Sequence, residues 1–272
     1  MEKVVNTNPL IAKPPKEVPL KAAPLVRVIA QVRFPPILSI QERSFVGHFQ
    51  EAIREKYPIL QPEQTHGLIF SPQGLMPTEP QRIWRFAGAD GNWRVSLASD
   101  FISLETVAYS SRSDFLRRLE NVLLALDTHI KPQIVERFGL RYIDRLVNQE
   151  MQDISKLVRP EIAGILGTEV GQSVDMTINE SLFNLPEGQE QIIVRWGLLP
   201  ANATIDPVAV EPVAEPSWVL DIDMSLSTQR SFSVEGLVSE GQQFAERIYT
   251  VFRWVVNDDF LRRFGGELRV LF

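Results

Sequence analysis

The chain contains no cysteine among its 272 residues, and this absence removes several kinds of chemistry together. Without cysteine there is no disulfide, no thiolate zinc site and no thiol nucleophile. The only histidines are His48, His66 and His129, which lie far apart and lack the spacing of a metal site. The composition therefore favours a reducing cytoplasm, and we expect neither a resident metal nor another cofactor.

Long apolar runs are also missing. No stretch approaches the ~20 apolar residues that a membrane-spanning helix needs. Residues 1–24 hold five prolines with lysines between them and lack the continuous apolar core of a signal peptide. We therefore expect an extended, proline-rich arm at residues 1–24 and no association with a membrane.

Basic residues are outnumbered, because 28 lysines and arginines face 34 aspartates and glutamates, for a net charge of -6. Neutralisation of phosphates by a basic surface supplies most of the affinity for nucleic acids. This composition therefore disfavours a nucleic-acid partner, although a local basic patch remains compatible with it.

Alternating and helical patterns are present in the first half of the chain. Residues 25–34 are β-branched and apolar, as in a strand, and apolar residues spaced three and four apart from Phe45 to Ile53 predict a helix. Three short alternating segments predict an antiparallel meander (82–86, 93–97 and 101–107). A long amphipathic helix follows, capped by Ser111 or Ser113.

The second half repeats this order. Residues 140–147 read as a strand, 153–164 as a short helix interrupted at Pro160, and three alternating segments follow (174–178, 192–196 and 218–224). A long helix with Phe244 and Ile248 on its apolar stripe closes the repeat. Residues 200–216 hold four prolines and no basic residue, which predicts a surface loop within the second meander.

These patterns predict an α+β fold made of duplicated β-α-β(3–4)-α units, 25–139 and 140–272. The units would form a pseudo-two-fold body with an antiparallel sheet and a long helix at the end of each unit. Both long helices are expected to run into an Arg-Phe-Gly sequence, at 137–139 and 263–265, with Gly139 as a left-handed residue after the first. The alternative is one larger α+β domain whose elements follow a similar order.

Arginines on predicted strands are the clearest candidates for a ligand site. Arg141 and Arg145 share one face of the 140–147 strand while Tyr142 projects from the other, and Arg195 occupies a similar polar position. Such arginines can bind a carboxylate or phosphate through two hydrogen bonds. The favoured alternative is that they form structural ion pairs with Asp221 and Asp223.

Asp221 and Asp223 share one face of their predicted strand. Two neighbouring carboxylates can hold Mg²⁺, which makes them a weak metal candidate, but such residues more often form the solvated side of a strand. The chain has no G-x-S-x-G, P-loop, G-x-G-x-x-G or H-E-x-x-H motif, so no residue is assigned a catalytic role.

The segment Arg137-Phe138-Gly139-Leu140-Arg141-Tyr142-Ile143-Asp144-Arg145 resembles a sporadically distributed family of bacterial and archaeal proteins of unknown function. The segments around 24–34, 218–223 and 252–265 are also similar, so the resemblance spans most of the chain. It implies no particular activity, and the patchy distribution of that family suggests an accessory role in a mobile or defence-associated system.

The sequence thus predicts a non-enzymatic, cytoplasmic binding or interaction protein with a protein partner or a second copy of itself. The alternative is a nucleotide-linked or nucleic-acid-linked factor, or an enzyme, that uses the arginine face together with Asp221 and Asp223.

Overall fold

The protein is an α+β structure whose main feature is an antiparallel sheet. The computed structural model describes residues 8–65, 68–71, 74–77, 81–186 and 188–267. Nine strands are hydrogen-bonded in the order β10-β11-β12-β9-β1-β7-β6-β5-β2. Two further pairs, β13 with β8 and β3 with β4, form short separate ladders. The α+β class and the antiparallel sheet expected from the sequence are confirmed.

The chain folds into two compact units, each assembled from separate stretches. The first unit comprises 1–27, 141–225 and 243–272, and the second comprises 28–140 and 226–242. The predicted halves 25–139 and 140–272 are continuous stretches of sequence, whereas each of these units combines stretches that are separate in sequence. The duplication itself stays a prediction.

In the second unit a meander carries two helices. Its strands are the larger part of β1 (Leu25–Arg33) together with β2 (Ile59–Thr65), β5 (Gln81–Ala87), β6 (Trp93–Leu97) and β7 (Phe101–Thr106). Along the chain, the small ladder of β3 (Leu68–Ser71) and β4 (Gly74–Pro77) comes between β2 and β5. Antiparallel pairing joins β1 to β7, β7 to β6, β6 to β5 and β5 to β2. The strands predicted at 25–34, 82–86, 93–97 and 101–107 are therefore confirmed.

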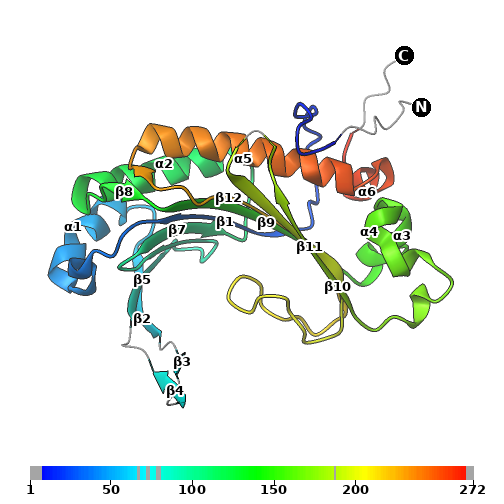
Figure 1. Cartoon of the computed structure of the whole chain (residues 1–272), viewed down its shortest axis with the longest axis horizontal. Helices are drawn as coiled ribbons and strands as arrows, with labels where there is room; N and C mark the ends of the chain where they lie inside the picture. The colour runs from blue at the N-terminus through cyan, green and yellow to red at the C-terminus, as the bar shows by residue number, and fades with distance from the viewer. Residues whose placement is uncertain (1–7, 66–67, 72–73, 78–80, 187, 268–272) are drawn as a thin grey trace. The chain divides into compact units, whose positions relative to one another are not determined.

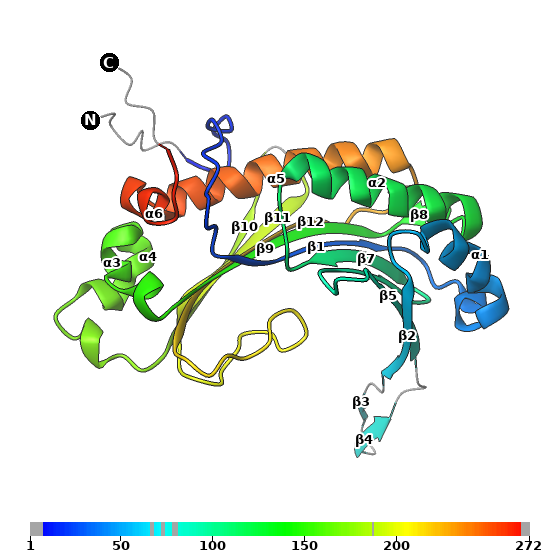
Figure 2. The ribbon, with the colours of Figure 1, turned by 180° about the vertical axis from the view of Figure 1, so that it is seen from behind.

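The helices α1 (Arg43–Ile53) and α2 (Arg112–His129) lie side by side against this meander (Figures 1 and 2). Phe49 of α1 packs edge-on against Phe86 of β5, with ring centroids 5.7 Å apart. Phe115 of α2 packs on Trp93 of β6 at 5.9 Å. Burial of these aromatic rings, each of which removes a large apolar area from water, holds the helices to the sheet.

The first long helix, α2, has a side-chain cap at its start and ends well before Arg137. Ser111 is its N-cap, because the Ser111 hydroxyl accepts from the Asp114 N–H at 3.2 Å. Lys131 then adopts a positive φ of 58°, and Pro132 follows. The prediction that this helix runs into Arg137-Phe138-Gly139 is wrong: these residues lie within strand β9 (Arg137–Val147), and Gly139 is a strand residue.

The first unit holds the remaining strands of the sheet. They are most of β9 together with β10 (Thr177–Asn184), β11 (Glu190–Leu199) and β12 (Ser217–Leu226). The strand expected from 218 to 224 is confirmed, and Trp218, Leu220, Ile222 and Met224 are buried, but Val219 and Asp221 on the other face are buried as well. The strand predicted around 174–178 begins later, at Thr177.

Short helices and the chain ends complete the first unit. The interrupted helix expected at 153–164 appears as α3 (Ile154–Leu157) and α4 (Pro160–Ala163), and α3 contacts α6 (Asp258–Arg263) (Figure 1). Asn257 caps α6, and Gly265 after it adopts a φ of 77°, the left-handed conformation that was predicted for Gly139 instead. The long helix α5 (Val234–Val255) begins well before Phe244, and ahead of it the strand β13 (Arg230–Ser231) pairs with β8 (Ile134–Val135).

The proline-rich arm is anchored on the first unit over the part that the structure describes, which begins at residue 8. Arg247 of α5 donates to the carbonyl oxygens of Pro9 and Ala12 at 2.7 and 2.8 Å. The Tyr249 hydroxyl accepts from the Val18 N–H at 2.8 Å. Two side chains of one helix therefore fix the path of the arm.

Candidate functional site

The predicted arginine face is built on four neighbouring strands of the first unit. On β9, successive side chains alternate between faces, so Arg141 and Arg145 share a face as expected. The strand order places β12, with Asp221, beside β9, and β11, with Arg195, beyond it. The face is therefore a row of polar side chains that crosses the strands.

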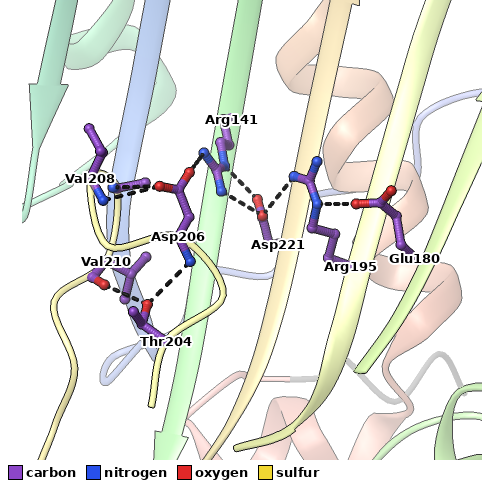
Figure 3. A network of polar contacts seen from close by, with 9 residues as sticks. Arg141, Glu180, Arg195, Thr204, Asp206, Val208, Val210 and Asp221 are labelled. Carbon is purple, nitrogen blue, oxygen red and sulfur yellow. Dashed lines mark hydrogen bonds and ion pairs between the residues drawn. The ribbon is translucent and has the colours of Figure 1, made fainter. Parts of the chain in front are cut away.

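Asp221 joins two of the arginines (Figure 3). The Nε and Nη2 groups of Arg141 donate to its two carboxylate oxygens, each at 2.8 Å. Arg195 donates from Nη1 to the same carboxylate at 3.3 Å and from Nε to Glu180 of β10. Asp221 thus accepts from a guanidinium on either side.

A loop residue completes the row. Asp206 lies in the 200–216 segment and accepts from Nη1 of Arg141 at 2.8 Å. The polar row, defined as Asp206, Arg141, Asp221, Arg195 and Glu180, therefore sets three carboxylates against two guanidiniums (Figure 3).

Burial makes the centre of this row depend on pairing. The side chain of Asp221 is 0% exposed and that of Arg141 is 14% exposed. Burial by itself lowers the pKa of Arg141, but the hydrogen bonds and charges of Asp221 and Asp206 raise that pKa above its ordinary value. The pKa of Arg195 is likewise raised by Glu180 and Asp221 against the effect of burial. Both guanidiniums are held charged at any physiological pH.

Arg141 and Arg195 therefore form structural ion pairs, the favoured alternative in the sequence analysis, and Asp221 is their shared partner. The reading of Asp221 as a solvated strand residue is wrong, because the carboxylate is fully buried beneath two arginines. Asp223 is half-buried on the same strand. In the described part of the chain no group of three or more acidic or histidine side chains is arranged to hold a metal ion.

The 200–216 segment is folded onto the polar row. It forms no strand, as predicted, and lies on the face of the strands away from the C-terminal part of α5 (Figures 1 and 2). Asp206 Oδ1 accepts from the N–H groups of Val208 and Ala209, and the Thr204 hydroxyl donates to the Val210 carbonyl at 2.6 Å. Ala209 and Val210 are buried, so the expectation of a simple surface excursion is corrected at these residues.

Arg145 stands apart from the polar row. Its Nη2 group donates to the carbonyl oxygen of Glu211 at 2.8 Å, and no carboxylate among the described residues forms an ion pair with it. Burial lowers the pKa of this guanidinium. Arg145 is thus the one arginine of the three candidates whose charge the fold leaves without an acidic partner in the described structure.

The opposite face of β9 carries Tyr142 and Asp144. Tyr142 is half-buried, whereas Asp144 is only 7% exposed. Loss of hydration raises the pKa of the Asp144 carboxyl to about 7. Asp144 belongs to the segment 137–145 that carries the family resemblance, but nothing in that segment predicted its burial.

One end of the nine-stranded sheet is formed by an exposed strand, β10, for which the sequence predicted no role. β10 has β11 as its only neighbour in the nine-stranded order. Ile178, Leu182 and Phe183 of β10 are 48%, 56% and 37% exposed. The sequence did hold one signal of this exposed strand. Apolar residues lie on both of its faces, with Ile178 and Leu182 on one and Phe183 on the other.

Comparison with protein-family models and with curated proteins finds no match to this chain. Of the helices that the structure describes, none combines the length and apolar character needed to cross a bilayer.

Proposed function

We propose that this protein is a binding protein that takes up an extended segment of a protein partner along β10. The observation that carries the proposal is the character of this sheet edge. An edge strand presents unpaired N–H and C=O groups, and natural proteins usually protect such strands with lysine, proline or a bulge. β10 is eight residues long and has neither lysine nor proline.

The other terminal strand of the sheet provides a comparison. β2 carries Pro62 and Glu63 in its centre, which is the usual protection against pairing with another chain. β10 has Glu180 as its only charged residue, and Glu180 is paired with Arg195. Backbone pairing with a partner strand would give affinity, and the exposed Ile178 and Leu182 would give specificity.

The polar row supports a binding role over the nucleotide-linked alternative. Arg141 uses Nε, Nη1 and Nη2 in bonds to Asp221 and Asp206, so a phosphate would have to displace protein carboxylates. Asp221 is in turn held by two arginines, which leaves it poorly placed to bind Mg²⁺. We propose that the row fixes the register of β9 to β12 and thereby holds β10 in place, in a non-enzymatic protein of the cytoplasm, as an accessory factor.

We also propose that the fold arose by duplication. In each half the first strand lies beside the last strand of its meander, β1 beside β7 and β9 beside β12. A long helix follows each meander, and Phe115 and Phe244 are buried residues of these helices.

The binding proposal is tested by capture of partners from the native host on three forms of the tagged protein. The edge variant combines Ile178→Lys with Leu182→Lys, and the matched control is Val208→Lys, at an apolar side chain that is 80% exposed on the 200–216 loop. We expect one stoichiometric protein on the wild type and the control, and its loss from the edge variant.

Unchanged capture by the edge variant would overturn the role of β10. Retention of a nucleotide or nucleic acid in place of a protein would overturn the binding-protein proposal itself. Circular dichroism and thermal unfolding serve to check that all three forms are folded.

A further inference from the structure

Arg145 is a buried arginine whose guanidinium has a donor without a hydrogen-bond partner. The residue is 9% exposed, and the one hydrogen bond of its guanidinium among the described residues runs from Nη2 to the Glu211 carbonyl oxygen. Its Nε group is buried without a hydrogen-bond partner. A guanidinium has five N–H donors in a planar fork, and in Arg145 the Nε donor of this fork is left unsatisfied.

A second unsatisfied group lies at the same end of the same two strands. The hydroxyl of Ser217, the first residue of β12, is buried without a partner, and the residue is 1% exposed. β9 and β12 are antiparallel neighbours joined by the Arg141–Asp221 contact. Arg145 lies four residues after Arg141 on β9, and Ser217 lies four residues before Asp221 on β12. Both side chains are therefore on the face of the polar row.

An uncompensated charge and an unpaired hydroxyl are each costly to bury, because both lose their hydrogen bonds to water. The cost disappears when a group that accepts several hydrogen bonds and carries negative charge occupies the same place. A carboxylate or phosphate meets both conditions, since its oxygens can accept from two N–H groups of arginine and from a hydroxyl. Neutral and cationic ligands leave the charge of Arg145 uncompensated.

We infer that Arg145 and Ser217 form a binding site for an oxyanion, beneath the 200–216 loop that supplies the Glu211 carbonyl. The site differs from the polar row, in which every guanidinium already faces carboxylates. It is independent of the proposed role of β10, because it rests on different residues and a different kind of contact. The anion is a carboxylate or a phosphate group, and the loop that carries Glu211 would close over it.

Thermal unfolding in the presence of inorganic phosphate or acetate tests this site, with sodium chloride at matched ionic strength as the reference. A ligand that binds only the folded state raises the unfolding temperature in a saturable way. We expect a rise of about 2–4 °C near tenfold excess over the dissociation constant. The rise should be absent in Arg145→Gln and at least halved in Ser217→Ala.

The control is Arg33→Gln, at an arginine that is paired with Asp100 and 46% exposed. This variant should respond to the anion as the wild type does. A response to phosphate alone assigns a phosphate site, and a response to acetate assigns a carboxylate site. No saturable response of the wild type to either anion, or an equal response in Arg145→Gln, overturns the inference.

A second measurement needs no ligand. In buffer with chloride as its only anion, Arg145→Met should be at least as stable as the wild type, because it removes an uncompensated buried charge. A fall in the unfolding temperature larger than that of Arg33→Gln would show that Arg145 has a structural role, and would also overturn the site.

Discussion

Asp221 is the residue on which the polar row depends. Its carboxylate is fully buried and accepts hydrogen bonds from Arg141 and Arg195. Removal of one partner from a buried ion pair leaves the other charge unpaired in a medium that solvates it poorly. The stability of the first unit should therefore be sensitive to this carboxylate.

We expect Asp221→Asn to lower the free energy of unfolding by about 3–5 kcal/mol, measured by urea denaturation. The control is Glu180→Gln at the exposed end of the row, where the side chain is 56% exposed and a loss within about 1 kcal/mol is expected. If Asp221→Asn unfolds at the same urea concentration as the wild type, the structural role of the row is wrong.

Asp144 should make stability depend on pH near neutrality. Burial raises the pKa of its carboxyl to about 7 in the folded state, above the ordinary value of 3.8. Between these values the folded protein holds a proton that the unfolded chain has released, so this group favours folding at low pH and its contribution falls as the pH rises towards 7.

The variant Asp144→Asn removes this dependence, because the amide is neutral at every pH. We expect it to be more stable than the wild type at pH 8 and to approach the wild type at pH 5, with a change of at most about 1.4 kcal/mol per pH unit between them. Urea denaturation at both pH values measures the difference. Parallel stability curves for the two proteins would show that Asp144 titrates normally.

Among single residues, the sequence predicted which side chains share a face but not how they are paired. Alternation on 140–147 was enough to place Arg141 and Arg145 together. The burial of Asp221 and the contact from Asp206 could not be read locally, because the partners lie 80 and 65 positions from Arg141. The difference between Arg141 and Arg145 depends on that long-range pairing alone.

At the scale of the element, periodicity identified most helices and strands because their apolar faces are continuous. The clear failure was the end of the first long helix. Lys131 with a positive φ and Pro132 end the helical path, and the chain then enters β9 through Arg137. The two Arg-Phe-Gly sequences are therefore in different structures, a strand and the end of α6, although the residues are the same.

The proline-rich arm depends on α5. The charged hydrogen bonds from Arg247 to the carbonyls of Pro9 and Ala12 should contribute about 1.5–3 kcal/mol to its docking. We expect Arg247→Ala to speed trypsin cleavage after Lys16 by about tenfold or more, because the arm leaves the surface more often.

Limited proteolysis followed by mass spectrometry measures this cleavage. The control, Arg262→Ala at an arginine that is 60% exposed on α6, should leave the rate of cleavage after Lys16 unchanged. An unchanged rate in Arg247→Ala would mean that other contacts hold the arm.

At the scale of the whole molecule, each compact unit is discontinuous in sequence. The first unit needs residues 1–27 as well as 141–225 and 243–272, and the Arg145 N–H donates to the Pro24 carbonyl at 2.9 Å. A fragment of residues 140–272 lacks the arm and β1. We therefore expect this fragment alone to unfold without a cooperative transition in circular dichroism, and a cooperative transition would show that the sequence half is an independent domain.

The central claim is that a protein partner pairs with β10, and hydrogen exchange on the captured complex tests it most directly. Amides along an unpaired edge exchange quickly, and pairing with a partner strand protects them. The account predicts slower exchange at residues 177–184 in the complex than in the free protein, with little change in β2. Protection elsewhere on the protein, with 177–184 unchanged, would contradict it.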